Sequence, residues 1–323
     1  MTTRTALPAI QTTGLRKTFG DHVVLDGIDL EVAEGTVFAL LGPNGAGKTT
    51  AVHILSTLLA PDGGTAQVGG HDVVKEPDAV RSLIGLTGQF SAVDALFTGE
   101  ENLQLMADLR HLGKREGRAR VAELLERFDL VEAAGKPTAT YSGGMRRRLD
   151  LAMTLVGDPR IIFLDEPTTG LDPRSRRTMW DIIRELVADG VTIFLTTQYL
   201  DEADRLAYRI AFLDRGRIVA QGTPAELKRL VPGGHIRLEF SDPAELDKAA
   251  GVLDVTSRDD EGLALQVPTS AGVHSLRAVL DRLDGASIDV AGLSVETPDL
   301  DDVFLSLTDR TAAAPAVHQG ALR

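Results

Sequence analysis

The sequence predicts an α/β fold, and three observations support this prediction. Short apolar runs alternate with helical patterns at residues 36–42, 160–167, 191–197 and 209–214. Runs with so little polar alternation are typical of strands buried on both faces, as in a parallel sheet covered by helices. A glycine-rich segment follows the first run and an acidic pair ends the second. Because open α/β sheets bind ligands at the carboxyl ends of their strands, we expect the functional site at that edge.

The composition is that of an ordinary globular protein of one or two domains: 323 residues, 43% hydrophobic and 25% charged. A net charge of −13 lacks the basic surface that nucleic acids require, so we expect no nucleic-acid partner and interpret the arginines at 146–148 as solvated. The absence of cysteine excludes disulfides and fits a reducing compartment. We expect no secretory signal and no bilayer-spanning run, so any membrane role requires a partner.

The order of patterns predicts a main domain, a smaller second domain and a tail. Their expected bounds are residues 1–232, with a helical insert at about 90–156, then residues 233–310, and finally a flexible tail at 311–323. After a Pro-Gly turn signal, the second part restarts as strand, helix, strand, strand, helix, strand. That order predicts a small α+β domain of the split βαβ, ferredoxin-like kind; an irregular extension of the main domain is the alternative.

The segment GPNGAGKTT fits the phosphate-binding pattern Gly-x-x-x-x-Gly-Lys-Ser/Thr, and it lies between a predicted strand and a predicted helix. In this pattern, backbone amides and a helix N-terminus surround phosphate oxygens. Lys48 would reach the β and γ phosphates, and the Thr49 hydroxyl would hold Mg²⁺. A glycine-rich turn without function is the alternative. The predicted nucleotide-binding residues here are Gly42, Pro43, Asn44, Gly45, Ala46, Gly47, Lys48, Thr49 and Thr50.

The segment IIFLDE places two carboxylates where an apolar strand ends. We expect Asp165 to serve Mg²⁺, directly or through water, and Glu166 to orient or deprotonate the attacking water. An acidic pair at a helix N-terminus before Pro167 is the alternative. The phosphate-binding pattern upstream favours the functional interpretation.

A third segment, YSGGMRRRLDLA, predicts a second anion-binding helix N-terminus. Ser142, Gly143 and Gly144 precede an amphipathic helical pattern, so their amides are exposed to a ligand. One phosphate-binding loop is enough to hold a triphosphate, so a second such end suggests that the phosphates are held from two sides.

The order of these motifs, together with Gln89 and the later TGLD segment, resembles the ATP-binding subunits of ABC transporters over about residues 10–230. The resemblance implies a P-loop NTPase core with a helical subdomain. SGGM resembles the family signature Leu-Ser-Gly-Gly-Gln, from which Tyr141 and Met145 depart. The form YSGGMRRRLDLA and the segment PDLDDVFLSLT at 298–308 are most similar to the daunorubicin-type drug-resistance ATP-binding proteins.

The resemblance also implies a head-to-tail homodimer in which each phosphate-binding loop faces the other copy's Ser142–Gly144 across ATP. Phe19 would lie against adenine, with a core phenylalanine as the alternative. Gln89 would link Mg²⁺ and the attacking water to the helical subdomain, with an ordinary loop glutamine as the alternative. Asp172 would join the dimer contact near the catalytic water, with a helix cap before Pro173 as the alternative.

Gln198 follows a predicted buried strand, where the family usually has a histidine that contacts the γ-phosphate. Glutamine keeps a hydrogen-bond donor and acceptor there but cannot become cationic. We interpret Gln198 as the γ-phosphate sensor; a strand-end polar residue without function is the alternative. With Glu166 and Gln89 it completes the predicted catalytic set.

The function that these motifs and the resemblance imply is that of an ATP-hydrolysing exporter subunit. It would dimerise around two ATP molecules with Mg²⁺ and drive a separate multi-span permease from the cytoplasmic face of the membrane, exporting a drug-like or hydrophobic compound. Two alternatives remain: a soluble ABC ATPase that acts on ribosomes or DNA, and a switch that hydrolyses ATP slowly.

Overall fold

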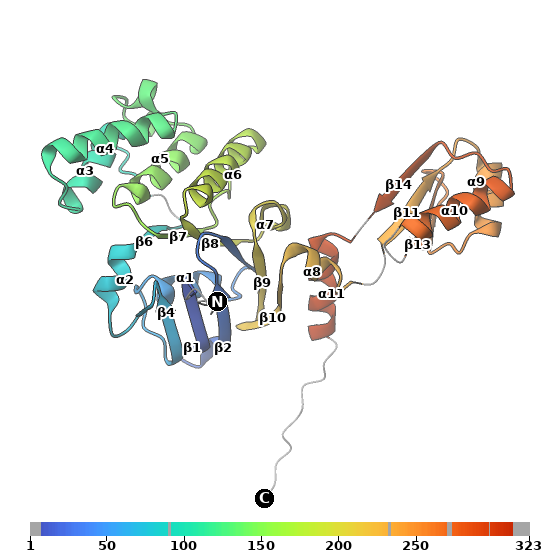
Figure 1. The fold of residues 1–323 in the computed structure, drawn as a ribbon, viewed down its shortest axis with the longest axis horizontal. Coiled ribbons are helices and arrows are strands. Elements are labelled where there is room, and N and C mark those ends of the chain that lie inside the picture. The colour runs from blue at the N-terminus through green and yellow to red at the C-terminus, as the bar shows by residue number, and fades with distance from the viewer. Residues whose placement is uncertain (1–7, 90–91, 232–233, 270–272, 297, 313–323) are drawn as a thin grey trace, which may run out of the picture. The chain divides into compact units, whose positions relative to one another are not determined.

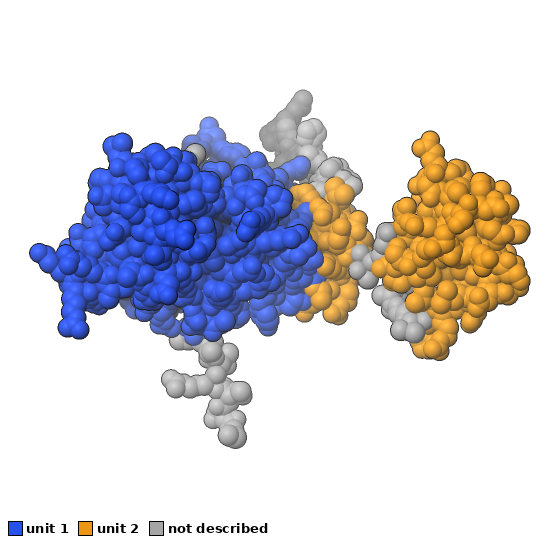
Figure 2. All heavy atoms as spheres, turned by 90° about the horizontal axis from the view of Figure 1, so that it is seen from above, with its two compact units in different colours: residues 1–224 blue, residues 225–323 orange. Residues whose placement is uncertain are grey.

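The computed structural model describes residues 8–89, 92–231, 234–269, 273–296 and 298–312. The chain forms two compact units, residues 1–224 and 225–323, coloured separately in Figure 2. Helix α8 (Pro224–Lys228) lies at the division, so the first unit ends earlier than the expected boundary after residue 232. Of the predicted tail, residues 311 and 312 belong to the last helix, and residues 313–323 lie outside the described residues.

The first unit is built around a six-stranded sheet in the order β10-β9-β3-β8-β7-β6, which confirms the predicted α/β class (Figure 1). Five of its strands are parallel, and only β10 runs antiparallel, beside β9. The strands are β3 (Val37–Leu41), β6 (Ile84–Thr87), β7 (Ile161–Asp165), β8 (Thr192–Thr197), β9 (Arg209–Asp214) and β10 (Arg217–Gly222). Strands β3, β7, β8 and β9 coincide with the four predicted apolar runs.

One face of this sheet packs against helix α1 (Lys48–Leu55) and a second, antiparallel sheet in the order β2-β1-β4-β5. Its strands are β1 (Ile10–Phe19), β2 (His22–Val32), β4 (Gly63–Val68) and β5 (His71–Asp72), with α2 (Pro77–Leu83) following. Phe38 and Phe194 stack in this core with ring centroids 5.5 Å apart. This second sheet was not predicted.

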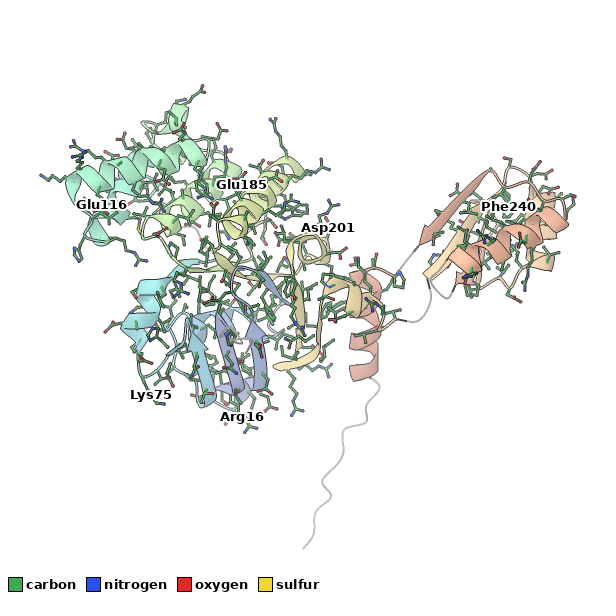
Figure 3. The ribbon with its side chains drawn as sticks, in the orientation of Figure 1. Arg16, Lys75, Glu116, Glu185, Asp201 and Phe240 are labelled. Carbon is green, nitrogen blue, oxygen red and sulfur yellow. The ribbon has the colours of Figure 1, made fainter. Side chains whose placement is uncertain are left out.

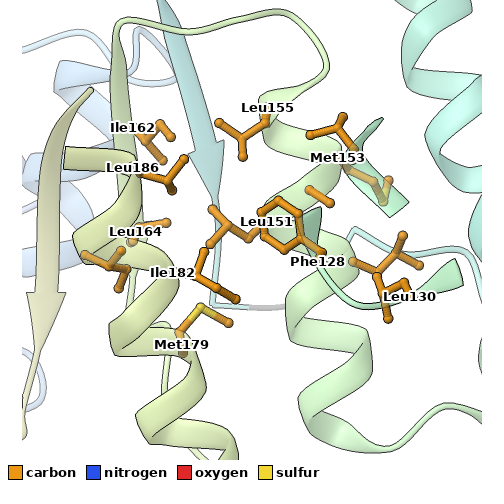
Figure 4. Packing of buried hydrophobic residues seen from close by; sticks show 14 of the residues in the cluster. Phe128, Leu130, Leu151, Met153, Leu155, Ile162, Leu164, Met179, Ile182 and Leu186 are labelled. Carbon is orange, nitrogen blue, oxygen red and sulfur yellow. The ribbon is translucent and has the colours of Figure 1, made fainter. Parts of the chain in front are cut away.

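The other face packs against the helices (Figure 4). Side chains alternate along β7, so Ile162 and Leu164 join the helical core while Ile161 and Phe163 join the opposite one. The helices are α3 (Gly99–Leu109), α4 (Lys114–Arg127), α5 (Gly143–Leu155), α6 (Pro173–Ala188) and α7 (Leu200–Leu206), with short 3₁₀ turns η1 (Val131–Ala133) and η2 (Thr138–Thr140). Within the described part of the segment at 90–156, the named elements are helices joined by loops, as predicted.

The second unit contains a four-stranded sheet in the order β12-β13-β11-β14 with every neighbouring pair antiparallel. Its elements are β11 (Gly234–Glu239), α9 (Pro243–Val252), β12 (Ser257–Asp259), β13 (Ala264–Thr269), α10 (Val273–Gly285), β14 (Gly292–Glu296) and α11 (Leu300–Ala312). Because β13 separates β11 from β12, and β11 separates β13 from β14, this is the predicted split βαβ arrangement. Phe240 is buried in its core (Figure 3).

Among the described residues, no helix combines the length and apolar character needed to cross a membrane.

Candidate functional site

The phosphate-binding segment connects the end of β3 to the start of α1, as the sequence predicted. Its backbone needs glycine at two positions for different reasons. Gly47, the N-cap of α1, has φ of 110°, a left-handed conformation that favours glycine. A Cβ on Gly42 would lie 2.2 Å from the carbonyl oxygen of Leu213, so the loop passes too close to β9 for a side chain. The resulting tight loop leads directly into a helix N-terminus, where amides can bind an anion.

Lys48 is buried in the centre of this loop. Its Nζ donates hydrogen bonds to the carbonyl oxygens of Gly42 and Pro43 at 2.8 and 3.2 Å, and it lies 3.7 Å from Oε1 of Glu166. Burial lowers the pKa of Lys48, while the charges of Glu166 and Asp165 oppose that shift. The ammonium therefore lies between loop carbonyl groups and the Glu166 carboxylate.

Asp165 is buried at the end of β7 and joins three elements. Its Oδ2 accepts a hydrogen bond of 3.0 Å from the Thr49 hydroxyl of α1, and its Oδ1 accepts one from the Thr196 hydroxyl of β8. Thr49 and Asp165 thus present two hard oxygen atoms side by side, which are ligands that Mg²⁺ prefers. The described residues contain no group of three or more His, Cys, Asp or Glu that could hold a metal. The oxygen pair of Thr49 and Asp165 would suit Mg²⁺, which is usually bound by one or two protein oxygens together with waters and phosphate oxygens.

Glu166 follows Asp165 with φ of 49°, a left-handed conformation that is rare for a residue with a side chain. Strand β8 holds this backbone in place: the Glu166 amide lies 3.0 Å from the carbonyl oxygen of Thr196 and 3.2 Å from its hydroxyl. On the other side, the Thr169 hydroxyl donates to Glu166 Oε2 at 3.3 Å. The carboxylate, whose side chain is only 10% exposed, therefore turns away from the strand direction and toward Lys48.

Ser142 is the N-cap of α5, and its hydroxyl accepts a hydrogen bond of 3.2 Å from the Met145 amide. Gly144 packs against α6 so closely that a Cβ there would lie 2.5 Å from the Ser175 hydroxyl. The two helix N-termini border a cavity of about 230 Å³ whose lining includes Ser142, Gly144 and Ser175. The segment Ser142–Gly144 therefore makes its described contacts with residues of α5 and α6.

Asp172 is the N-cap of α6, the role that the alternative interpretation gave it. Its carboxylate accepts hydrogen bonds from the backbone amides of Arg174 and Ser175 at 2.9 and 3.0 Å and from the Ser175 hydroxyl at 2.6 Å. The bonds from Ser175 lower the pKa of Asp172. Asp172 is nevertheless exposed, so capping leaves its outer surface open to a partner.

The two predicted glutamines are both exposed near the carboxyl edge of the parallel sheet, where Asp165 and Glu166 also lie. Gln89 follows β6 by two residues and Gln198 follows β8 directly. Phe19 ends β1 with half of its surface exposed, so the alternative of a core phenylalanine is wrong. Its ring instead lies 5.4 Å from the Lys17 ammonium.

The expectation that the arginines at 146–148 are solvated is wrong for Arg147, which is buried in α5. It pairs with Asp150, one helical turn away, at 3.2 Å, and burial raises the pKa of the Asp150 carboxyl. A signal was available: Arg147 and Asp150 share a helical face with Leu151 and Thr154, which the spacing i, i+3, i+4, i+7 identifies and which is buried. Opposite charges within a buried face indicate a structural or functional pair.

Sequence reasoning also missed Thr196, which holds Asp165 and Glu166, and Glu202 of α7. Glu202 is fully buried, and its Oε1 accepts a hydrogen bond of 3.0 Å from Trp180 Nε1 of α6. Burial raises the pKa of its carboxyl. No local pattern marks either residue, because Thr196 lies within an apolar strand and Glu202 within an acidic first turn.

Comparison with known proteins gives matches in both units. Residues 25–169 match the family model described as ABC transporter, and residues 222–308 match that of the C-terminal domain of ATP-binding proteins like DrrA1-3. The chain is 50% identical over 302 residues to the daunorubicin resistance ATP-binding protein DrrA3 of Streptomyces coeruleorubidus, covering 93% of this chain and 96% of that protein. It is 38% identical over 307 residues to the Nod factor export ATP-binding protein I of Paraburkholderia xenovorans, with coverages of 94% and 97%.

Solved structures of ATP-binding cassettes are also similar. An ATP-binding subunit of an ABC transporter aligns with a TM-score of 0.62 at 27% identity, covering 69% of this chain and 92% of that one. A dimeric cassette in a post-hydrolysis state, bound to ADP and phosphate, aligns with a TM-score of 0.60 at 25% identity, with coverages of 66% and 98%.

Proposed function

The chain belongs to the daunorubicin/doxorubicin-resistance family of ABC transporter ATP-binding subunits, and from that membership we propose that it drives the export of a drug-like or hydrophobic compound through a separate permease. It is an ATPase of the P-loop class. The observation that carries the site assignment is the contact network in which Lys48 and Thr49 of the phosphate loop meet Glu166 and Asp165 at the end of β7.

In this proposal the loop amides at 42–50 and the Lys48 ammonium bind the β and γ phosphates of ATP. Phe19 stacks on adenine, supported by its exposed ring at the end of β1. Thr49 and Asp165 hold Mg²⁺, with Gln89 as a further oxygen ligand. The bound cation supplies charge neutralisation for the phosphate oxygens.

Glu166 orients the attacking water and accepts its proton. Two observations support this role: its backbone is fixed by Thr196, and its carboxylate lies 3.7 Å from the Lys48 ammonium at the phosphate loop. Gln89 positions the water, and Gln198 contacts the γ-phosphate with its amide. Chemistry in such a site consists mainly of positioning and charge stabilisation.

A second copy of the chain completes the site in this proposal. Ser142–Gly144 present a helix N-terminus that borders an open cavity and contacts α5 and α6, so its amides are available to the triphosphate held by a partner. Asp172 is exposed beside that surface. ATP then closes the dimer by adding contacts that exist only across the interface, and hydrolysis removes them.

The dimer acts on a multi-span permease at the cytoplasmic face of the membrane. The names of the relatives, which refer to drug resistance and to Nod factor export, favour export over the alternative of a soluble ABC ATPase acting on ribosomes or DNA.

The test is affinity purification of the tagged full-length chain from gently solubilised membranes, followed by identification of stoichiometric partners. The Lys48→Ala variant is a matched control, because the substitution is confined to a buried residue of the phosphate loop. Recovery of one multi-span membrane protein with both forms is the expected result. Recovery with ribosomes or DNA, or without any membrane protein, would overturn the exporter assignment.

A further inference from the structure

A buried ion pair on α5 connects three parts of the site that are far apart in the sequence. Arg147 and Asp150 lie one turn apart on the face of α5 that packs toward the central sheet. The same helix begins at Ser142, whose N-terminal amides are proposed to meet the partner's ATP. The pair is therefore attached to the element that would sense the closed dimer.

Arg147 uses its whole guanidinium to hold backbone carbonyl groups on both sides of the predicted catalytic residues. Its Nη2 donates to the carbonyl oxygen of Asp165 at 3.1 Å, and its Nε donates to that of Pro167 at 2.8 Å. Glu166 lies between these two residues in the chain. The third donor, Arg147 Nη1, donates at 3.0 Å to the carbonyl oxygen of Gly88, the residue immediately before Gln89.

Asp150 holds the other side of the Gln89 loop. Its Oδ1 accepts a hydrogen bond of 3.0 Å from the Ala92 amide, while its Oδ2 accepts from Arg147 Nη1 at 3.2 Å. The chain on both sides of Gln89 is thus tied to adjacent charged groups of one helix. Residues 90 and 91 lie outside the described residues.

These contacts couple any movement of α5 to two loops, the one that carries Gln89 and the one that carries Glu166. A buried charge that loses its partners pays a large desolvation penalty, so α5 cannot shift alone and leave Arg147 among apolar groups. The carbonyl groups of Gly88, Asp165 and Pro167 must follow the guanidinium or be replaced by other partners. A planar, five-donor guanidinium can hold three carbonyl groups and a carboxylate at once, which an ammonium cannot do in the same directions.

We propose that Arg147 and Asp150 are positioning residues for ATP hydrolysis, which place Gln89 and Glu166 according to the position of the Ser142 end of α5. This inference rests on the proposed roles of Gln89 and Glu166. The pair itself does not touch ATP. Its effect is on how often the catalytic groups are in reacting geometry when the dimer is closed.

The central variant is Arg147→Lys, which keeps the charge beside Asp150 but loses the planar fork. It should lower kcat about tenfold and change KM for ATP by less than about twofold, since the phosphate loop is untouched. Asp150→Asn keeps an accepting oxygen for only one of its two partners, the Ala92 amide and Arg147 Nη1, and should lower kcat in the same direction. The matched control is Arg146→Lys, an exposed arginine on the same helix that donates to the carbonyl oxygens of Thr138 and Ala139.

A double-mutant cycle separates positioning from a merely structural role. If Arg147 acts through the Gln89 loop, Arg147→Lys should cost less in a Gln89→Ala background than in the wild-type chain. Thermal unfolding of each full-length variant shows whether it is folded; if Arg147→Lys does not fold, the cycle is run with Asp150→Asn.

Two results would overturn the proposal. One is a folded Arg147→Lys or Asp150→Asn protein with wild-type kcat. The other is a double variant with Gln89→Ala whose loss of kcat equals the product of the two single losses, because the two sites would then act independently. Failure of the underlying assignment is distinguishable, because Gln89→Ala and Glu166→Gln are then active on their own.

Discussion

The Thr49 hydroxyl donates a hydrogen bond of 3.0 Å to Asp165 Oδ2, which connects residues separated by 116 positions in the chain. The bond joins the start of α1 to the end of β7 and places two oxygen atoms of the kind that Mg²⁺ binds at the same point of the sheet edge. Thr196 fixes the other carboxylate oxygen, so Asp165 has a single defined orientation.

Replacing Asp165 with asparagine should weaken Mg²⁺ support for hydrolysis, because an amide oxygen carries no net charge. We expect the Mg²⁺ concentration for half-maximal turnover to rise about tenfold or more. Turnover measured against Mg²⁺ at fixed ATP checks this, with Asp78→Asn, an exposed aspartate of α2, as the control. An unchanged Mg²⁺ dependence would show that Asp165 does not serve the cation.

Lys48→Ala should weaken ATP binding about 10- to 100-fold, because it removes a charge-assisted contact with the phosphates. Titration with ATP, followed by intrinsic fluorescence or calorimetry, measures the change. Lys75→Ala is the matched control, since Lys75 is exposed (Figure 3) and forms an ion pair with Asp72, outside the phosphate loop. Equal affinity of the Lys48→Ala and control proteins would contradict the phosphate role.

Glu166→Gln should lower kcat about 100-fold or more while ATP binding persists, because the amide cannot accept the proton of the attacking water. The trapped ATP-bound form should then accumulate as a dimer, detectable by size-exclusion chromatography with ATP present. Glu132→Gln changes an exposed glutamate outside the site and serves as the control. Wild-type turnover in Glu166→Gln would exclude Glu166 as the base.

Gln198→His should keep ATP affinity and raise turnover modestly, because imidazole can hydrogen-bond the γ-phosphate and can also become cationic. Steady-state turnover at saturating Mg-ATP is the measurement, and Gln198→Ala gives the baseline without a hydrogen-bonding side chain. A loss of turnover in the Gln198→His protein would contradict this interpretation of Gln198. Very slow turnover in the wild-type chain would instead favour the switch function.

Glu202→Gln should stabilise the fold at neutral and alkaline pH. Burial raises the pKa of the Glu202 carboxyl above its ordinary value of 4.5, so the folded state binds this proton more tightly than the unfolded state. The contribution to stability is therefore present below pH 4.5 and is lost as pH rises through the folded-state pKa. Glutamine does not titrate and can still accept the hydrogen bond from Trp180.

Thermal unfolding of both proteins between pH 5 and pH 9 would measure this difference. A gain of about 1 kcal/mol corresponds to about 2–4 °C in Tm for a unit of this size. The advantage of Glu202→Gln should grow with pH; an advantage that is constant or shrinks with rising pH would contradict a buried, titrating carboxyl. Glu185→Gln on α6, an exposed glutamate, is the control (Figure 3).

The parts of the site that the sequence predicts are those whose chemistry is contiguous in the chain. Lys48 and Thr49 belong to a loop with a fixed spacing, and Asp165 and Glu166 directly follow an apolar run, so local pattern was enough. The order of elements in the second unit was predictable for the same reason, because each strand and helix carries its own pattern.

The rest depends on tertiary contacts. Thr196 acquires its role only because β8 lies next to β7 in the sheet, and the sequence of neither strand determines which strands become neighbours. Arg147 is buried because loops distant in the sequence cover it, as its hydrogen bonds to the carbonyl oxygens of Gly88 and Pro167 illustrate. The antiparallel sheet of the first unit was missed because strand β1 alternates buried and exposed residues only in part.

The left-handed backbone conformation of Glu166 implies a trade-off between the stability of the fold and the proposed activity. A side chain in that conformation costs about 1–2 kcal/mol relative to a residue that adopts it freely, and glycine is such a residue. A laboratory selection for thermal tolerance alone would therefore favour replacing this glutamate with glycine, and under the role proposed for Glu166 the selected proteins would be more stable but would lose ATP hydrolysis.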